Sequence, residues 1–192
     1  MFVCNQLSQL VGQTLKNVVK PPLQLTLAII KPDVCKDPNR LNAIRNMIKI
    51  NGFYFIRSLI TRMSELEAKD FYSEHKDKFF YWRLVSFMSS GVISCHILAK
   101  HNAITEWRQL MGPTKVYMTK FNEPNTIRAL YGLSDTRNAT HGSDSSQSFE
   151  REFKHFFPDF DSDKWFAEQM QHFINGTDIE FLAEEWIHRL KR

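Results

Sequence analysis

A strand pattern at residues 23–30 restricts the fold more than any other feature of the sequence. Its side chains alternate between apolar and polar at first and then become continuously apolar. A strand of that kind is buried on both faces, which indicates a central place in a sheet. Lys31 and Pro32 follow at once. Because proline has no amide hydrogen for the sheet ladder, the strand is expected to end there and to leave a lysine at its end.

The remaining patterns predict further strands joined by helices. Two more strands are expected at 53–62 and 92–99, and a fourth in the segment around His141. Helical spacing of apolar residues predicts helices at about 38–49, 64–75, 79–88 and 102–111, a short helix beginning at 123–128, and another helix after residue 145. This βαββαβ order favours an α+β fold: a ferredoxin-like, four-stranded antiparallel sheet with helices joining its non-adjacent strands on one face.

Composition excludes several classes of protein. The 192 residues suit one domain with a peripheral extension, and no apolar run approaches the roughly 18 residues of a membrane span. The net charge of +4 suits an anionic ligand, but no basic run is interleaved with aromatic residues, which argues against a nucleic-acid partner. Cys4, Cys35 and Cys95 are odd in number and scattered, so we expect neither a disulfide framework nor a zinc site.

Residues 1–22 differ in composition from the rest of the chain. They contain no acidic residue, carry Lys16 and Lys20, and space their apolar residues as a helix would. Such a segment resembles a mitochondrial transit peptide, although it lacks the arginines that transit peptides favour. The alternative is an N-terminal arm that docks or stays unstructured. We therefore expect a mitochondrial or a cytoplasmic protein.

The segment from Asn138 to Ser145 carries the candidate chemistry. Within it, His141 is followed by a glycine and then by three small polar residues that can cap the next helix. A neutral imidazole accepts a phosphoryl group when one ring nitrogen is unprotonated and aimed at phosphorus. Gly142 would let a bulky anion approach, and Glu152 could reach back to the second ring nitrogen and hold the tautomer. The plainer alternative is a surface or capping histidine.

Two stretches of the sequence resemble signatures of the nucleoside diphosphate kinase family. The first is Asn-x-x-His-Gly-Ser-Asp-Ser at 138–145, and the second is Ile-Lys-Pro-Asp at 30–33. The resemblance spans residues 25–159, with the intermediate residues of the family's pattern in order. It implies that His141 is a covalent phosphate carrier. Glu152, from its place at the edge of the apolar stripe of the following helix, is the expected catalytic partner.

The same resemblance implies a set of nucleotide ligands. Lys31 would contact the travelling phosphate, Phe80 would lie against the base, and Asn138 would contact the 3′-hydroxyl of the sugar. The remaining expected ligands are Tyr72, Arg108, Thr114 and Arg128. Mg²⁺ is expected to bridge the phosphates of the nucleotide itself, with Asp144 in outer contact. Each of these residues, taken singly, is of a type that ordinarily serves packing, a turn or a solvated surface.

The implied reaction moves the γ-phosphoryl group of a nucleoside triphosphate, typically ATP, to His141 and then to a nucleoside diphosphate. This ping-pong scheme would make nucleoside triphosphates other than ATP. Phosphoryl transfer asks the protein mainly for alignment and for neutralisation of oxygen charge, which Lys31, Arg108 and Arg128 would supply. The alternative is a nucleotide-binding adaptor with weak intrinsic activity that acts through a partner protein.

Departures from the common pattern set expectations for assembly. The loop between Thr114 and Arg128 is longer than in the short form, and Tyr81-Trp82 replaces a proline-glycine step after Phe80. These features resemble the divergent group II branch of the family, so a homo-oligomer or a protein partner docked on the 113–127 loop or the C-terminal helices is expected. We divide the chain into an arm at 1–22, a kinase domain at 23–160 and a C-terminal extension of two helices at 161–192.

Overall fold

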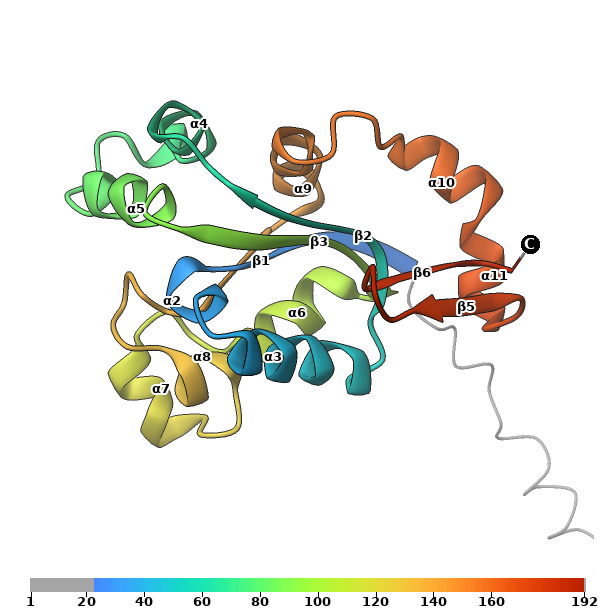
Figure 1. Cartoon of the computed structure of the whole chain (residues 1–192), viewed down its shortest axis with the longest axis horizontal. Coiled ribbons are helices and arrows are strands. Elements are labelled where there is room, and N and C mark those ends of the chain that lie inside the picture. Colours follow the sequence, from blue (N-terminus) through green and yellow to red (C-terminus); the bar gives the residue numbers. More distant parts are fainter. Residues whose placement is uncertain (1–22, 192) are drawn as a thin grey trace, which may run out of the picture.

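The computed structural model describes residues 23–191 and contains a four-stranded antiparallel sheet. The strands are β1 (Leu23–Ile30), β2 (Tyr54–Arg62), β3 (Val92–His101) and β4 (Thr140–Gly142), in the order β2-β3-β1-β4. Strand β1 is therefore central, as its continuously apolar pattern predicts, and Figure 1 shows it running through the middle of the molecule. The α+β, ferredoxin-like architecture expected from the element order is confirmed.

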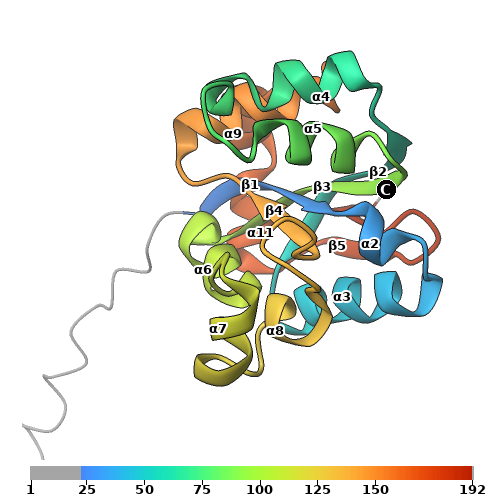
Figure 2. The same ribbon diagram turned by 90° about the vertical axis from the view of Figure 1, so that its left-hand side faces the viewer.

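Helices cover both faces of this sheet. They are α2 (Pro32–Cys35), α3 (Pro38–Ile50), α4 (Glu65–Phe71), α5 (Tyr81–Met88), α6 (Ala103–Met111), α7 (Val116–Asn122), α8 (Ile127–Tyr131), α9 (Ser146–Glu152), α10 (Ser162–Glu168) and α11 (Met170–Asn175), with 3₁₀ turns η1 (Ser73–His75) and η2 (Phe153–His155). Seen end-on in Figure 2, α3 and α6, which connect non-adjacent strands, lie below the sheet. Helices α4, α5 and α9 lie above it, so the sheet has a separate core on each face.

Local signals fix where several helices begin. A complete capping box begins α4: Ser64 accepts a hydrogen bond from the Glu67 amide, and the Glu67 carboxylate accepts one from the Ser64 amide. Asp37 caps α3, whose first residue is Pro38. Ser145 caps α9 by accepting a bond from the Ser148 amide at 3.1 Å, as expected of the polar residues after His141.

The prediction of a second C-terminal helix is wrong. Residues 162–175 are helical, but the following apolar residues form a hairpin of β5 (Ile179–Leu182) and β6 (Ile187–Leu190). The hairpin lies against the beginning of edge strand β2, where the Phe55 amide donates to His188 Nδ1 at 2.9 Å. Because an edge strand offers unpaired backbone groups and an apolar surface, these contacts outweigh the helical spacing of the local sequence.

The region between Thr114 and Arg128 is also more regular than the sequence indicates. It was expected to be a loop up to residue 123, but it contains α7. The short helix α8 begins at Ile127, so Pro124 precedes the helix instead of occupying its first turn. Residues 1–22, and with them the predicted transit peptide or arm, lie outside the described residues.

Candidate active site

His141 lies on β4, beside the central strand of the sheet. It pairs in register with Ile29 of β1, and its side chain is 20% exposed. Two residues earlier, Ala139 has a φ of 68°, a conformation that costs energy for a residue with a Cβ. Its amide donates to Asp33 Oδ2 at 3.2 Å, and its carbonyl accepts from the Lys31 amide at 2.8 Å. Both signature stretches are thus bonded directly to each other, and together they hold His141 in place.

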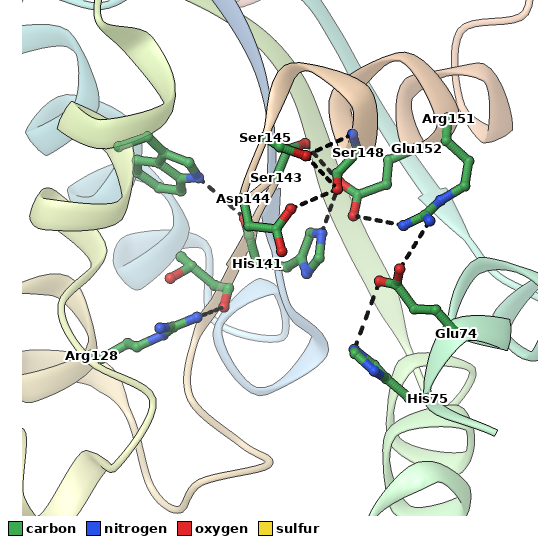
Figure 3. Close-up of polar contacts among 12 residues, drawn as sticks. Glu74, His75, Arg128, His141, Ser143, Asp144, Ser145, Ser148, Arg151 and Glu152 are labelled. Carbon is green, nitrogen blue, oxygen red and sulfur yellow. Dashed lines mark hydrogen bonds and ion pairs between the residues drawn. The ribbon is translucent and has the colours of Figure 1, made fainter. Parts of the chain in front are cut away.

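Glu152 fixes one side of the imidazole. Its Oε2 lies 3.2 Å from His141 Nε2 and accepts a 2.6 Å hydrogen bond from the Ser143 hydroxyl, as Figure 3 shows. The carboxylate is only 5% exposed. Burial acts to raise the pKa of Glu152, but His141, Ser143 and Arg151 together hold that pKa below its ordinary value. An ionised Glu152 therefore accepts a hydrogen bond from Nε2–H, which leaves Nδ1 as the basic nitrogen of the ring.

Aromatic side chains of α4 and its C-cap close another side of the histidine. The rings of Phe71 and Tyr72 lie edge-on to the His141 ring, with centroids 5.2 and 6.1 Å away. The Tyr72 hydroxyl is buried and has no hydrogen-bond partner among the described residues. Burial, with Glu152 nearby, raises the pKa of Tyr72 well above its ordinary range, so the hydroxyl stays protonated. Tyr72 is thus brought to the site, and the sequence does not predict the closer contact of Phe71 with His141.

A pocket of about 480 Å³ lies between α6, the segment after it and α8. Its lining includes Arg108, Thr114, Arg128 and Asp144, all of which the sequence singles out. Arg128 is held firmly: one guanidinium nitrogen donates to the Gly112 carbonyl at 2.8 Å. The other donates to the Thr140 carbonyl at 3.0 Å. Burial and the neighbouring Arg108 lower the pKa of Arg128 to about 10, which still leaves it cationic at neutral pH.

Lys31 and Asn138 form a buried pair beside this pocket. Lys31 Nζ donates to Asn138 Oδ1 at 2.6 Å. Burial first, and then the charge of Arg128, lower the pKa of Lys31 to about 7, while Asp33 acts in the opposite direction. An anion that reached this lysine would favour its charged form. The two cations Lys31 and Arg128, which come from distant parts of the sequence, are thus close enough to repel each other.

Phe80 is not brought to this pocket. The residue precedes α5, and its half-buried ring contacts His75 and Phe79 at centroid distances of 5.6 and 5.4 Å. It is not among the residues that line the pocket. Its role against a base stays a prediction.

Asp144 lies at the pocket and is mostly solvent-accessible. Its Oδ1 accepts a 2.6 Å hydrogen bond from the Ser148 hydroxyl, and this bond is the main cause that lowers the pKa of Asp144. Within residues 23–191, no group of three or more histidine, cysteine or acidic side chains could hold a metal ion. A cation at this site would therefore depend on oxygen atoms from its ligand.

Gly142 is needed for packing more than for access by an anion. A Cβ at this position would overlap the indole of Trp107 and the end of Met111. The same indole Nε1 donates to the His141 carbonyl at 3.2 Å, so Trp107 of α6 supports the back of β4. The apolar spacing of residues 102–111 predicts burial of the helix face that carries Trp107. Its spacing on α6 gave no signal of the contact with β4.

Comparison with known proteins identifies the family. The family described as Nucleoside diphosphate kinase matches residues 24–162. The chain belongs to the nucleoside diphosphate kinase family. It is 46% identical over 169 residues to nucleoside diphosphate kinase 6 of Danio rerio, covering 88% of this chain and 95% of that protein. It is 49% identical over 152 residues to nucleoside diphosphate kinase 6 of Homo sapiens, covering 77% and 79%. The chain is thus a family member close to nucleoside diphosphate kinase 6.

Solved structures of the family have the same fold. The Aquifex aeolicus nucleoside diphosphate kinase aligns with a TM-score of 0.68 and 32% identity, covering 73% of this chain and 96% of that one. A halophilic nucleoside diphosphate kinase from Halobacterium salinarum in complex with CDP aligns with a TM-score of 0.65 and 32% identity, covering 73% and 89%. As to membranes, none of the helices formed by residues 23–191 has the length and apolar character to cross one.

Proposed function

We propose that this chain is an active nucleoside diphosphate kinase that works by a ping-pong mechanism through phospho-His141. The γ-phosphoryl group of a nucleoside triphosphate, usually ATP, passes to His141 and then to a nucleoside diphosphate. One observation carries the proposal: Glu152 binds Nε2 of the imidazole, so Nδ1 keeps its lone pair, and Arg128 of the pocket donates to the carbonyl of Thr140, the residue before His141.

In the first half-reaction the Nδ1 lone pair forms a bond to the γ-phosphorus, and the bond from phosphorus to the bridging oxygen breaks. The nucleoside diphosphate leaves with the electron pair of that bond. The imidazole becomes positively charged as Nδ1 gives up its lone pair, and the buried carboxylate of Glu152 at Nε2 compensates that charge. The second half-reaction reverses these steps with a different diphosphate, so donor and acceptor can use the same pocket in turn.

The cations of the pocket neutralise charge on the phosphate oxygens. Arg108 and Arg128 line the pocket, and Thr114 adds a hydroxyl within 3.5 Å of Arg128. The Lys31–Asn138 pair presents a donor to the sugar hydroxyl and to the terminal phosphate. The Tyr72 ring lies edge-on against the carrier histidine, and Phe80, directly before α5, would contact the base.

Mg²⁺ fits this donor set as a companion of the nucleotide. Asp144 lines the pocket and its lowered pKa keeps it ionised, but it is a single carboxylate, which suits outer-sphere contact to a hydrated cation. When bound, Mg²⁺ would neutralise charge on the phosphate oxygens of the nucleotide and help to fix their geometry. The residues of the chain would then orient the phosphates toward His141.

The exposed surface of α7 favours a second element of the proposal, association with another chain. Tyr117 and Phe121 are 72% and 69% exposed, and their rings contact each other at 5.1 Å. Exposed aromatic clusters of this kind are typical of interaction surfaces. We propose a homo-oligomer or a protein partner at the 113–127 region. An adaptor with weak intrinsic activity is the alternative role. The location we propose is mitochondrial if residues 1–22 act as a transit peptide and cytoplasmic if they form an arm.

Incubation of the purified protein with γ-labelled ATP tests the proposal. We expect a label that is stable in alkali and labile in acid, that His141→Asn abolishes, and that added nucleoside diphosphate removes. His172→Asn is the matched control, because His172 lies on α11 with a side chain 41% exposed, beside Asp178. If wild-type protein binds ATP but takes up no label, the adaptor role is correct and the kinase proposal fails.

A further inference from the structure

Two acidic residues of one helical segment face two basic residues of another. We call residues 65–88, which comprise α4, η1 and α5, the lid. Glu74 Oε2 of the lid lies 2.9 Å from Arg151 Nη1 on α9, and Asp70 Oδ2 lies 3.8 Å from His155 Nδ1 on η2. Asp70 lies on α4 and Glu74 on η1, so both elements of the lid take part in these contacts. The Glu74–Arg151 ion pair therefore links the lid to α9 by charge, and Phe71 adds packing against His155 and Phe156.

Arg151 reaches a second carboxylate with its other nitrogen. Nη2 lies 3.8 Å from Glu152 Oε1, while Glu152 Oε2 is occupied by His141 and Ser143. Figure 3 shows the guanidinium between Glu74 and Glu152. Arg151 thus contacts the carboxylate oxygen that the histidine leaves open, and its charge favours the ionised form of that carboxylate.

The lid also contacts the carrier histidine directly. Phe71 and Tyr72, which lie between Asp70 and Glu74, place their rings edge-on to His141. Phe80, the proposed base contact, precedes α5 in the same lid. A shift of the lid relative to α9 would therefore change the wall around His141 and the place where a base can bind.

We propose that Arg151 is a positioning residue that couples the place of the lid to the orientation of Glu152 at the phosphate carrier. This inference rests on the proposed kinase function. Arg151 would act through Glu74 on nucleotide binding and through Glu152 on the rate of His141 phosphorylation. Its side chain is 48% exposed and that of Glu74 44%, so solvent screens the link and each effect is modest, about threefold to tenfold.

A set of charge variants separates the two roles. Arg151→Gln should raise KM for the nucleotide and lower the single-turnover rate of His141 phosphorylation, each by about threefold to tenfold. Glu74→Gln should raise KM alone. The swap Glu74→Arg with Arg151→Glu restores the lid pair but puts a carboxylate beside Glu152. It should return KM to within about twofold of wild type while phosphorylation stays slow.

Hydrogen exchange of the lid amides gives a readout that does not depend on activity. Arg151→Gln and Glu74→Gln should speed exchange in residues 65–75, and the charge swap should restore protection. Lys154→Gln is the matched control, because it removes a cation from the same α9–η2 segment. The Lys154 ammonium lies over the ring of Phe153, which is not part of the lid.

The outcomes distinguish this inference from the function on which it rests. An inactive wild-type protein, with the lid exchange responding as described, would refute the kinase proposal and leave the lid link standing. Active wild type with KM, phosphorylation rate and lid exchange unchanged in Arg151→Gln would refute the inference alone. A charge swap that restores KM and phosphorylation rate equally would refute the role of Arg151 at Glu152.

Discussion

The floor of the site and the C-terminal hairpin are both attached to the sheet, but they are built differently. We define the floor as Lys31, Arg128, Asn138, His141 and Glu152. Its charged groups are largely buried and held by short hydrogen bonds, such as the 2.6 Å bond from Lys31 to Asn138. The hairpin β5–β6 instead attaches aromatic rings to Phe55 at the edge of β2.

This difference has an energetic meaning. Burying a cation or a carboxylate costs free energy unless bonds offset the loss of water, and two cations side by side add repulsion. A fold that needed only stability would place apolar groups there. The aromatic contacts of the hairpin, by contrast, bury apolar surface at little electrostatic cost. Changes in the floor should therefore affect rate most, and changes in the hairpin should affect stability alone.

Glu152→Gln, a change in the floor, should give the largest loss of rate. The amide keeps the shape of the carboxylate but cannot compensate the charge that develops on the imidazole, so phosphohistidine formation should slow by about 10²-fold to 10⁴-fold. Rapid-quench measurement of the single-turnover rate tests this. Glu150→Gln, on the same helix and bonded to Ser162, is the control. A loss below about threefold for Glu152→Gln would remove Glu152 from the mechanism.

Arg128→Ala should give the next largest loss of rate, and unlike Glu152→Gln it should lower stability as well. The guanidinium neutralises phosphate charge, so we expect about 10²-fold to 10³-fold lower transfer. Because it also donates to the Gly112 and Thr140 carbonyls, unfolding free energy should fall by about 1–3 kcal/mol. Steady-state kinetics and urea unfolding measure the two effects, with exposed Arg137→Ala as control. An unchanged rate with lost stability would assign Arg128 to the fold.

Lys31 should give a pH dependence of intermediate size. Its pKa is about 7 in the folded chain and near the ordinary 10.5 when unfolded, so the unfolded state binds more protons between these values. Burial of Lys31 therefore lowers stability by its full amount below pH 7, and this loss of stability diminishes as pH rises toward 10.5. The phosphate of a nucleotide binds the charged form of this lysine, so KM should rise above pH 7, by at most about tenfold per pH unit.

Lys31→Arg tests that reasoning because arginine stays charged. The rise in KM for a nucleoside diphosphate between pH 7 and 9 should flatten in this variant, and the exposed control Lys36→Arg should keep the wild-type profile. An identical rise in Lys31→Arg would show that another group titrates.

Trp186→Ala should have the smallest effect on rate. Its ring packs on Phe55 and Phe181 at 5.7 and 5.5 Å, so truncation should lower unfolding free energy by about 2–3 kcal/mol, because Trp186 is only partly buried. Transfer rate should stay within about twofold of wild type. Thermal melting and steady-state assays measure both, with Ile50→Ala, at a 79% exposed position outside the lid and the floor, as the control. A large loss of rate would mean that the hairpin belongs to the site.

Within the floor, the sequence indicates the pairing of His141 with Glu152 from local signals. His141 lies on β4 and Glu152 on the helix that follows it, so their spacing indicates that they can meet. The bond from Ser143 to Glu152 was not expected, because the sequence assigns Ser143 to a helix cap. Strand β1 is equally clear because both of its faces are buried. Arg108, Thr114 and Arg128 were anticipated through resemblance to the family, since no local pattern distinguishes them from surface residues.

The contacts that the sequence does not reveal are long-range. Phe71 and Trp107 reach the histidine segment from other elements, and their spacing indicates only burial. Arg151 looks like any cation on a helix surface until Glu74 is placed opposite it. The hairpin was mistaken for a helix because the decisive partner, edge strand β2, lies more than a hundred residues away in the chain.

The position of the phosphate on the ring tests the central claim most directly. Glu152 occupies Nε2 of His141, so phosphorus should bond to Nδ1. ³¹P NMR of the protein phosphorylated by ATP and kept alkaline distinguishes the two isomers. We predict a single Nδ1-phosphohistidine resonance, absent in His141→Asn and lost when a nucleoside diphosphate is added. An Nε2-phosphohistidine, or a resonance that survives in His141→Asn, would contradict the account.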